Sequence, residues 1–248
     1  MNPVVREGYK FRQEICIPCY QTDQDARLRP AAFMDMAQEI AYWAASELGF
    51  GYDTLHIHHH AWVLTRMHVH FGHSLRWRDP AVLYTWHKGS EGPFYLRDFE
   101  LMGPDGKPAV QATSSWVVMD EQTRRLVRPE QLREQLHLDY EVGSAIEAPA
   151  PKLPPPPSLT PTLQPAQRVV YSDLDILGHT NNVRYAVWAM DCLPLELARR
   201  PMKDLYINFN KETTFGDTVQ LQSLETEDSF WVEGAVDGKS CFVVRMDF

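Results

Sequence analysis

A stretch in the C-terminal part of the chain combines side chains that can do chemistry with the start of a helix. Residues 171–192 read YSDLDILGHTNNVRYAVWAMDC, with polar side chains at Asp173, Asp175, His179, Asn181 and Asn182. Thr and Asn favour helix starts, where unpaired backbone N–H groups can hold a carbonyl oxygen or an anion. A His and an Asp beside such a start could move a proton. For either residue alone, a turn that only satisfies backbone groups is the default interpretation.

The composition predicts a globular protein. The 248 residues are 44% apolar, which suffices for one large domain or two small ones. The net charge of −9 argues against nucleic-acid binding and gives no reason to expect attachment to an anionic membrane. No apolar run approaches the roughly 18 residues that span a bilayer, and the N-terminus lacks the apolar core of a signal peptide. We therefore expect a cytoplasmic protein without membrane insertion, and a homodimer stays open.

Neither the cysteines nor the histidines predict a metal or redox site. Cys16 and Cys19 match C-x-x-C, but they lie in an apparent strand and not at a helix start, where a thiolate would be activated. His68 and His70 share a strand face and could chelate a metal, yet no Cys or carboxylate lies at a fitting local spacing. The sequence therefore predicts no metal and no cofactor.

The first half of the chain predicts a strand, a helix and then four strands. The helix begins at Pro30, which suits a first helical turn, and ends before Gly49. Runs rich in β-branched and aromatic residues, separated by turn signals, predict the strands. The expected ranges are 11–20 for the first strand, 30–48 for the helix, 61–71, 81–89, 94–102 and 107–119 for the later strands, and 120–136 for a turn and short helix.

A proline-rich connector separates this half from a second run of the same order. Eight of the chain's 18 prolines lie in 149–165, which favours a stiff extended segment without a core of its own. Beyond it we expect a strand at 166–171, a helix at 183–199 and strands at 203–212, 217–227, 229–236 and 239–248. The predicted organisation is therefore a domain at 1–146, a linker at 147–165 and a domain at 166–248.

The two halves also contain similar short sequence segments. The segment YQTDQD at 20–25 resembles YSDLD at 171–175, with the Asp pairs offset by 150 positions, from 23 to 173. A repeat of this length indicates two related domains. At that offset Arg29 takes the position of His179, and the first copy has no Asn pair. The chemistry is therefore expected in the second copy, with Asp173 as the more structural of its two acidic residues.

These motifs resemble those of acyl-ACP thioesterases of the bacterial and plant type. The segment D-L-D-(three residues)-H-T-N-N-V-R-Y at 173–185 is similar to the family's D-L-D-x-N-x-H-V-N-N-x-x-Y, and the resemblance covers nearly the whole chain. It implies an α+β fold, a double hot-dog in which two antiparallel sheets are each wrapped around a long central helix. This fold agrees with the element order predicted above.

The resemblance also implies catalytic residues. Asp175 and His179 match the family's active-site Asp and His, and Glu212 matches a further acidic residue one strand later. We expect Glu212 to activate a water, His179 to orient it or polarise the thioester carbonyl, and Asp175 to hold the His179 tautomer or share the base role. Two positions depart from the family: its Asn before the His is Leu177 here, and its Cys after the acid is Thr213.

The same resemblance implies the substrate and its binding surfaces. The substrate would be fatty acyl-ACP, hydrolysed to a fatty acid and acyl carrier protein. Thr180, Asn181 and Asn182 would support the oxyanion, together with N–H groups at the helix start. The acyl chain would lie in the first domain, with these candidates, each of which could equally be core: Phe33, Met36, Ile40, Trp43, Trp62 and Leu64. A basic rim for the acidic carrier would consist of Arg184, Arg199, Arg200 and Lys203.

Three other functions stay open at this stage. The nearest is an acyl-CoA thioesterase of the same fold, and a non-catalytic protein that binds acyl thioesters belongs to a different class. A hot-dog dehydratase fits less well, because its usual His and carboxylate pattern differs from this segment. The acyl chain length cannot be read from the sequence.

Overall fold

The computed structural model describes residues 2–128, 142–154 and 160–248, and it divides into two compact units. Unit 1 comprises Met1–Thr65 and Val69–Ala150, and unit 2 comprises Arg66–His68 and Pro151–Phe248. The division near Ala150 falls within the predicted linker. The helix expected in 120–136 lies largely outside the described residues.

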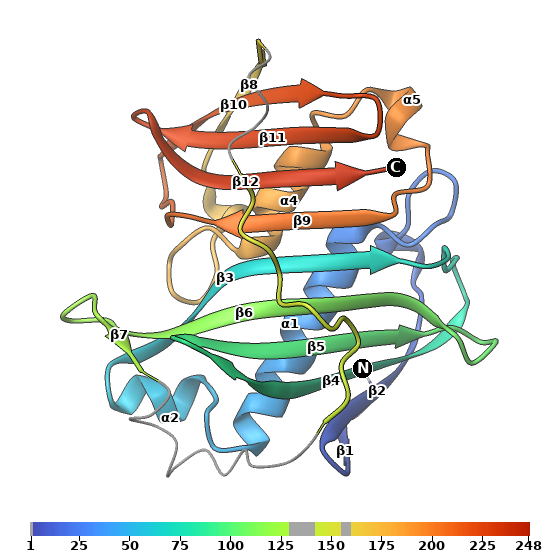
Figure 1. The fold of residues 1–248 in the computed structure, drawn as a ribbon, viewed down its shortest axis with the longest axis vertical. Helices are drawn as coiled ribbons and strands as arrows, with labels where there is room; N and C mark the ends of the chain where they lie inside the picture. The colour runs from blue at the N-terminus through green and yellow to red at the C-terminus, as the bar shows by residue number, and fades with distance from the viewer. Residues whose placement is uncertain (1, 129–141, 155–159) are drawn as a thin grey trace. The chain divides into compact units, whose positions relative to one another are not determined.

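Unit 1 is an antiparallel sheet packed on one long helix. The sheet has the order β1-β2-β4-β5-β6-β3, with β7 paired to β6. The bounds are β1 Val5–Glu7, β2 Lys10–Cys16, β3 His60–Phe71, β4 Pro80–Glu91, β5 Phe94–Met102, β6 Pro108–Asp120 and β7 Leu126–Val127. Helix α1, Pro30–Glu47, packs against β2 and β4 and lies behind the strands in Figure 1. Two short helices, η1 Cys19–Gln21 and α2 Tyr52–Ile57, complete the unit.

Unit 2 repeats this plan. Its sheet has the order β9-β12-β11-β10-β8, and helix α4, Asn182–Met190, packs against β11 and β12 (Figure 1). The remaining bounds are β8 Thr162–Arg168, η2 Tyr171–Asp173, α5 Leu195–Ala198, β9 Asp204–Phe209, β10 Thr218–Glu225, β11 Ser229–Val236 and β12 Lys239–Asp247. The predicted order of elements is therefore present in both units.

Helix α4 is shorter than predicted. The sequence predicts one helix over 183–199, whereas α4 ends at Met190 and a separate four-residue helix, α5, begins at Leu195. Pro194 precedes α5 in an extended conformation with ψ 142°. Proline restricts the helical conformation of the residue before it and cannot donate a backbone hydrogen bond, so the apolar periodicity of this segment spans two helices.

The connector is packed more closely than its proline content predicts. Ala150 and Leu153 are buried, and the Leu153 N–H donates to Asn208 Oδ1 over 2.7 Å. Strand β8 begins inside the predicted linker, at Thr162. Its pairing with β10 shifts register between Val219 and Leu221, opposite Pro165. A bulge on an edge strand accommodates a residue that has no N–H to donate.

The outer face of the unit 1 sheet carries a buried ion pair beneath the segment at 142–146 that leads into this connector. Lys88 Nζ lies 3.2 Å from Asp98 Oδ1, and these side chains are 5% and 0% exposed. The Ala145 N–H donates to Asp98 Oδ2 over 2.8 Å, and Lys88 donates to the Ile146 carbonyl. Burial raises the pKa of Asp98. The pair therefore anchors the connector to this sheet.

The burial of His87 predicts that the stability of unit 1 depends on pH. This side chain is 9% exposed and pairs across the strands with Arg97. Burial, followed by the Arg97 charge, lowers the pKa of His87 from 6.5 to about 3. The unfolded chain therefore binds a proton below about pH 6.5 that the folded chain does not accept until about pH 3. The free energy of unfolding should fall as the pH decreases through this window.

Urea unfolding of the wild type and His87→Gln between pH 7 and pH 3.5 tests this expectation. We expect the loss of stability on acidification to be smaller in the variant, since Gln has no proton to gain. Parallel curves for the two proteins would show that His87 is not responsible.

Among the described residues, no helix is long and apolar enough to cross a membrane.

Candidate active site

Two of the three catalytic candidates, Asp175 and His179, lie on a loop of unit 2 between η2 and α4. Leu174 and Thr180 form an isolated β-bridge, and Gly178 takes a positive φ of 75° that lets the loop turn back. Asp175 Oδ1 accepts the N–H groups of Leu177 over 2.9 Å and His179 over 3.2 Å. The carboxylate thus closes the loop from inside.

A second segment brings Glu212 beside His179. The Thr180 N–H donates to the Thr213 carbonyl over 2.9 Å, and His179 forms a β-bridge with Thr214. This pairing places His179 Nδ1 3.6 Å from Glu212 Oε2, with the two side chains 33% and 38% exposed. The distance exceeds that of a direct hydrogen bond, and both side chains are open to water. The structure therefore brings together two of the three predicted catalytic residues through their side chains.

Asp175 contacts His179 in a different way from the one expected. The sequence predicts that its carboxylate holds the imidazole tautomer, but the carboxylate accepts the backbone N–H of His179. An Asp side chain readily bonds to nearby backbone groups, which explains this arrangement. Asp175 therefore positions the loop that carries His179.

Asp173 has the structural place predicted for it. The residue is 3% exposed. Its carboxylate accepts hydrogen bonds from the Val170 N–H over 2.9 Å and from Arg184 Nε over 2.8 Å. It ties the loop to α4 and faces away from water.

The helix start offers fewer free donors than the sequence predicts. Thr180 is buried, with its N–H on the Thr213 carbonyl and its hydroxyl 2.7 Å from the Thr213 hydroxyl. Asn181 Oδ1 caps the Val183 N–H over 2.9 Å, and the Arg184 N–H donates to the Asn181 carbonyl. Within the described part of the chain, the Asn182 N–H has no acceptor. The N–H and hydroxyl of Thr180 are thus both engaged by Thr213, whereas Asn182 begins α4, and the oxyanion role of these residues stays a prediction.

Unit 1 contains a loop of the same kind. Structural alignment of the two loops gives a different residue offset from the one that sequence similarity suggests. Helix α4 begins at Asn182 and α1 at Pro30, which gives an offset of 152 positions and not 150. Asp23 Oδ1 accepts the N–H groups of Asp25 and Arg27 in unit 1, as Asp175 does in unit 2. Asp175 therefore corresponds to Asp23 of unit 1. Closing the loop is a structural role that requires no catalytic function.

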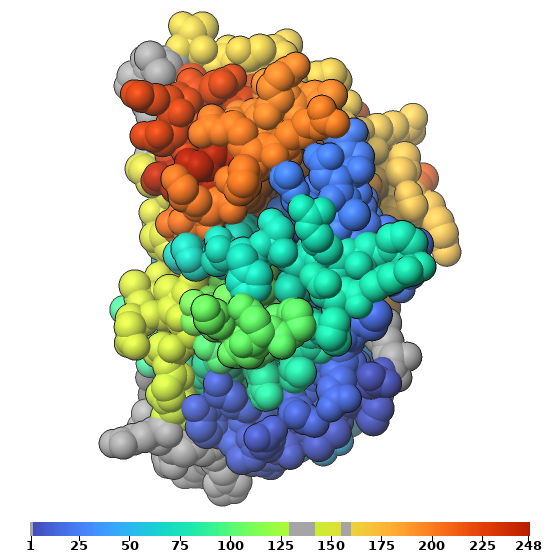
Figure 2. Space-filling model, turned by 90° about the vertical axis from the view of Figure 1, so that its right-hand side faces the viewer, coloured from blue at the N-terminus to red at the C-terminus, as the bar shows by residue number. Residues whose placement is uncertain are grey.

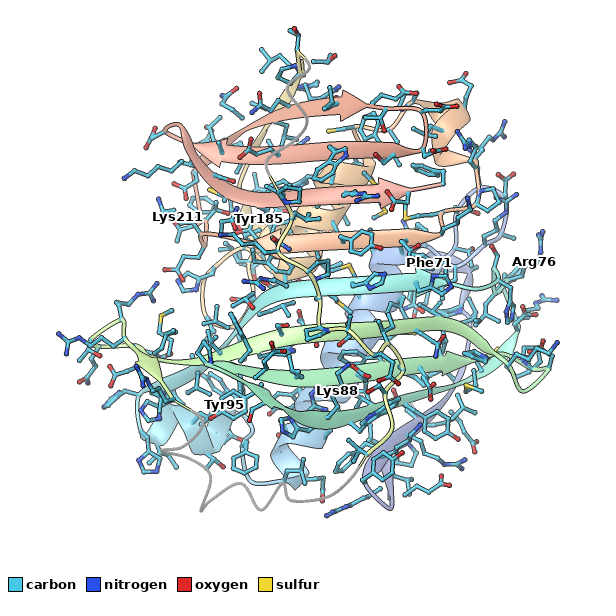
Figure 3. All side chains as sticks on the ribbon, in the orientation of Figure 1. Phe71, Arg76, Lys88, Tyr95, Tyr185 and Lys211 are labelled. Atoms are coloured by element: carbon cyan, nitrogen blue, oxygen red, sulfur yellow. The ribbon has the colours of Figure 1, made fainter. Side chains whose placement is uncertain are left out.

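In the structural alignment of the two loops and their bridge partners, unit 1 lacks both members of the candidate pair. Arg27 corresponds to His179, because Arg27 pairs with Arg76 as His179 pairs with Thr214. Counting back from Arg76 places Ser74 at the position of Glu212. The exposed side chain of Arg76 lies at the edge of unit 1 in Figure 3. The candidate pair therefore has no counterpart at these positions of unit 1, and the assignment of the chemistry to the second copy stays a prediction.

The acyl-pocket candidates divide into buried and exposed residues, all in unit 1. Phe33 and Ile40 are fully buried and Leu64 is 6% exposed, while Met36 and Trp62 are half-buried. Trp43 is 47% exposed, and its indole donates to Glu39 one turn earlier on α1. Trp43 therefore lies on an exposed side of α1, away from the buried residues of that helix, and its role as a lining residue stays a prediction.

The histidine-rich segment does not form a metal centre in the part of the chain that the structure describes. No group of three His, Cys, Asp or Glu side chains there could hold an ion. His68, grouped with unit 2, instead lies 2.8 Å from Asp204 Oδ1 and stacks on Tyr206.

Two antiparallel sheets, each packed on a helix, define a double hot-dog fold. Residues 8–135 match the family model for the acyl-ACP thioesterase N-terminal domain, and residues 161–240 match that for the acyl-ACP thioesterase C-terminal domain. The chain therefore belongs to the acyl-ACP thioesterase family.

Curated relatives agree with this assignment. The chain is 25% identical to oleoyl-acyl carrier protein thioesterase 2, chloroplastic, of Arabidopsis thaliana over 246 residues, covering 91% of this chain and 65% of the relative. It is 29% identical to palmitoyl-acyl carrier protein thioesterase, chloroplastic, of Gossypium hirsutum over 253 residues, covering 96% and 60%. The chain thus spans about two thirds or less of the length of these relatives.

Solved structures share the fold. The 12:0-ACP thioesterase of Umbellularia californica superposes with a TM-score of 0.87 at 21% identity, covering 98% of each chain. An acyl-ACP thioesterase of Bacteroides thetaiotaomicron gives a TM-score of 0.79 at 24% identity, covering 97% of this chain and 98% of that one.

Proposed function

We propose that this chain hydrolyses fatty acyl-ACP thioesters to a fatty acid and free acyl carrier protein. The observation that carries the proposal is the His179–Glu212 pair in unit 2, with Nδ1 and Oε2 3.6 Å apart and open to water. Family membership and the names of the relatives support the substrate.

The pair is suited to activating a water. In the proposed reaction Glu212 accepts a proton from the water as it attacks the thioester carbon, and His179 orients the same water. The carbonyl oxygen gains negative charge, which the Asn182 N–H at the start of α4 would stabilise. The C–S bond then breaks, and the departing thiolate takes up the proton that Glu212 accepted from the water, which restores the carboxylate. A thiol leaves readily, so one carboxylate base is sufficient.

A covalent route through cysteine has little support in this chain. Thr213 follows Glu212, where the resembling family has Cys. Burial, followed by the Asp191 charge, raises the pKa of Cys192 to about 11, and burial raises the pKa of Cys241. A raised pKa means less thiolate at a given pH, and the thiolate is the nucleophile.

The rate of alkylation should distinguish Cys192 from the exposed Cys16 and Cys19. At pH 8, iodoacetamide should label Cys16 and Cys19, which are exposed, about 100-fold faster than Cys192 in the folded chain. Peptide mass spectrometry measures the rates, with the unfolded chain as the control in which all four react. We expect hydrolysis to survive the labelling of Cys16 and Cys19. Rapid labelling of Cys192 with loss of activity would favour a cysteine mechanism.

The carrier would dock on basic side chains in unit 2. The exposed α5 segment, orange in Figure 2, precedes Arg199, Arg200 and Lys203. Lys203 Nζ donates to the Phe248 carbonyl over 2.9 Å, and Arg200 lies over the Phe248 ring. Arg184 is less available, because Asp173 binds its guanidinium. Arg199, Arg200 and Lys203 are therefore the stronger candidates for a surface that meets an acidic carrier.

Parallel assays with acyl-ACP and acyl-CoA of the same chain length test the proposal. We expect a higher kcat/KM with acyl-ACP. A preference for acyl-CoA would favour the rival thioesterase, and tight binding of either thioester without turnover would favour a non-catalytic protein. The cellular location and a homodimer stay predictions from the sequence.

A further inference from the structure

Three buried hydroxyl groups lie directly behind the candidate catalytic pair. Tyr185 Oη lies 2.9 Å from Thr213 Oγ1, which in turn lies 2.7 Å from Thr180 Oγ1. Tyr185 Oη also accepts the Thr213 N–H over 3.1 Å. Tyr185, Thr180 and Thr213 are 3%, 4% and 1% exposed. We call these three residues the hydroxyl triad.

The triad joins the two backbone segments that carry the pair. Thr180 follows His179 directly, and Thr213 follows Glu212 directly. Tyr185 lies on α4 and bonds to Thr213 in the second segment, and Figure 3 labels its side chain in unit 2. Because each triad residue is held by buried hydrogen bonds, a shift of either segment would break at least one of them.

The corresponding positions in unit 1 are apolar. At the offset of 152, Leu28 and Phe33 take the places of Thr180 and Tyr185. Leu75 takes the place of Thr213, because each directly precedes the bridge partner of its loop, Arg76 in unit 1 and Thr214 in unit 2. The equivalent backbone bond is kept, since the Leu28 N–H donates to the Leu75 carbonyl over 2.8 Å. Leu75 is 2% exposed and Phe33 is fully buried. The loop of unit 1 therefore folds without hydroxyl groups at these positions, with Leu75 and Phe33 buried and Leu28 half-buried.

Hydroxyl groups at such sites need a reason other than the fold. Burying a hydroxyl costs free energy unless it is hydrogen-bonded, and apolar groups of similar shape often serve equally well. The triad occurs in the copy that holds His179 and Glu212, while the copy with Arg27 and Ser74 has the apolar set. This contrast within one chain connects the hydroxyls to the pair.

We propose that Thr180, Thr213 and Tyr185 are positioning residues that hold His179 and Glu212 at the separation the hydrolytic water requires. The proposal rests on the proposed function for its chemistry, and on the geometry of unit 2 for its structure. Tyr185 acts as a neutral hydrogen-bonding group, because burial raises the pKa of its phenol and keeps it protonated. It has no direct contact with the reacting atoms in this account.

Tyr185→Phe is the sharpest variant, because Phe is the residue that unit 1 uses. We expect kcat on acyl-ACP to fall about 10- to 100-fold, since small misplacements of catalytic groups have effects of this size. KM should stay within about threefold. The melting temperature should fall by only a few degrees, because the buried Thr213 N–H loses its acceptor while the core stays packed. A purely structural role would instead lower the fraction of folded enzyme without this split between kcat and KM. Tyr206→Phe, on the outer face of β9, is the matched control and should leave kcat unchanged.

A second pair of variants covers the case in which Tyr185→Phe folds poorly. Thr213→Val removes the central hydroxyl at nearly constant shape and should lower kcat, while Thr213→Ser keeps the hydroxyl and should restore most of it. Equal, near-normal kcat values for Tyr185→Phe and Thr213→Val would overturn the positioning role.

A crystal structure of Tyr185→Phe makes the result independent of turnover. We expect His179 Nδ1 and Glu212 Oε2 to lie further apart than the 3.6 Å of the wild type. An unchanged separation would contradict the proposal. Inactivity of the wild type on acyl-ACP, with a changed separation in the variant, would refute the proposed function and leave the positioning role intact.

Discussion

Glu212→Gln is expected to lower kcat on acyl-ACP by about 100- to 10,000-fold, the usual contribution of a general base. The amide of Gln is nearly the same size as the carboxylate, but it cannot accept a proton from the attacking water. Glu212 lies after β9 with its side chain 38% exposed, so the substitution should leave the fold intact. Steady-state hydrolysis with purified acyl-ACP measures the effect.

Glu227→Gln is the matched control for this substitution. Glu227 is exposed in the turn between β10 and β11, and its replacement should leave kcat within about twofold. A Glu212→Gln enzyme with near-normal kcat would remove Glu212 as the base.

His179→Ala is expected to lower kcat by about 100-fold or more, because the water would lose the group that orients it beside Glu212. The loop should persist in the variant, since its bonds involve the His179 backbone and not the imidazole: Asp175 accepts the N–H of residue 179, and Thr213 accepts that of Thr180. Hydrolysis and circular dichroism together separate loss of chemistry from loss of fold.

His73→Ala provides the comparison for removal of an imidazole. His73 lies in unit 1 with its side chain 40% exposed, and its replacement should have no measurable effect on hydrolysis. Comparable losses in His73→Ala and His179→Ala would point to a general effect on the protein and not to a catalytic role.

The sequence predicts most of the fold because its signals are local. Hydrophobic spacing and the flanking Pro30 and Gly49 predict α1 to within one residue of its observed end at Glu47. Turn residues likewise divide β4, β5 and β6 close to their observed ends. The end of α4 was missed because the apolar spacing continues past Met190, whereas Pro194 ends the helical conformation.

The connector shows what composition alone does not reveal. A proline-rich stretch predicts an extended conformation, and the conformation of β8 is indeed extended. Whether an extended segment pairs with a sheet depends on an edge strand elsewhere in the chain. Here β10 is that edge, and a bulge opposite Pro165 makes the pairing compatible with proline.

The site was predictable as a set of residues but not as a set of contacts. His179 and Glu212 were predicted from a resemblance, and the structure places their side chains 3.6 Å apart. Sequence similarity alone suggests a repeat offset of 150 positions, because the two Asp-containing segments at 20–25 and 171–175 are alike. The hydrogen bonds of Asp23 and Asp175 show that the aligned residues differ from those the letters suggest.

Thr180 illustrates the same limit for a single side chain. In the sequence it is a hydroxyl beside a helix start, which suits an oxyanion donor. Its partner, Thr213, lies 33 positions away, and only the fold shows that this contact buries the hydroxyl. The apolar counterparts in unit 1 then become informative, because they reveal which contacts the fold itself does not need.

The most direct test of the account compares substitutions at equivalent positions of the two loops. The enzyme with His179→Ala and Glu212→Gln should hydrolyse acyl-ACP at least about 100-fold more slowly than the wild type. The enzyme with Arg27→Ala and Ser74→Ala, the corresponding changes in unit 1, should stay within about threefold of it. Equal rates for the two double variants, or a larger loss in the unit 1 variant, would contradict the assignment of hydrolysis to the loop of unit 2.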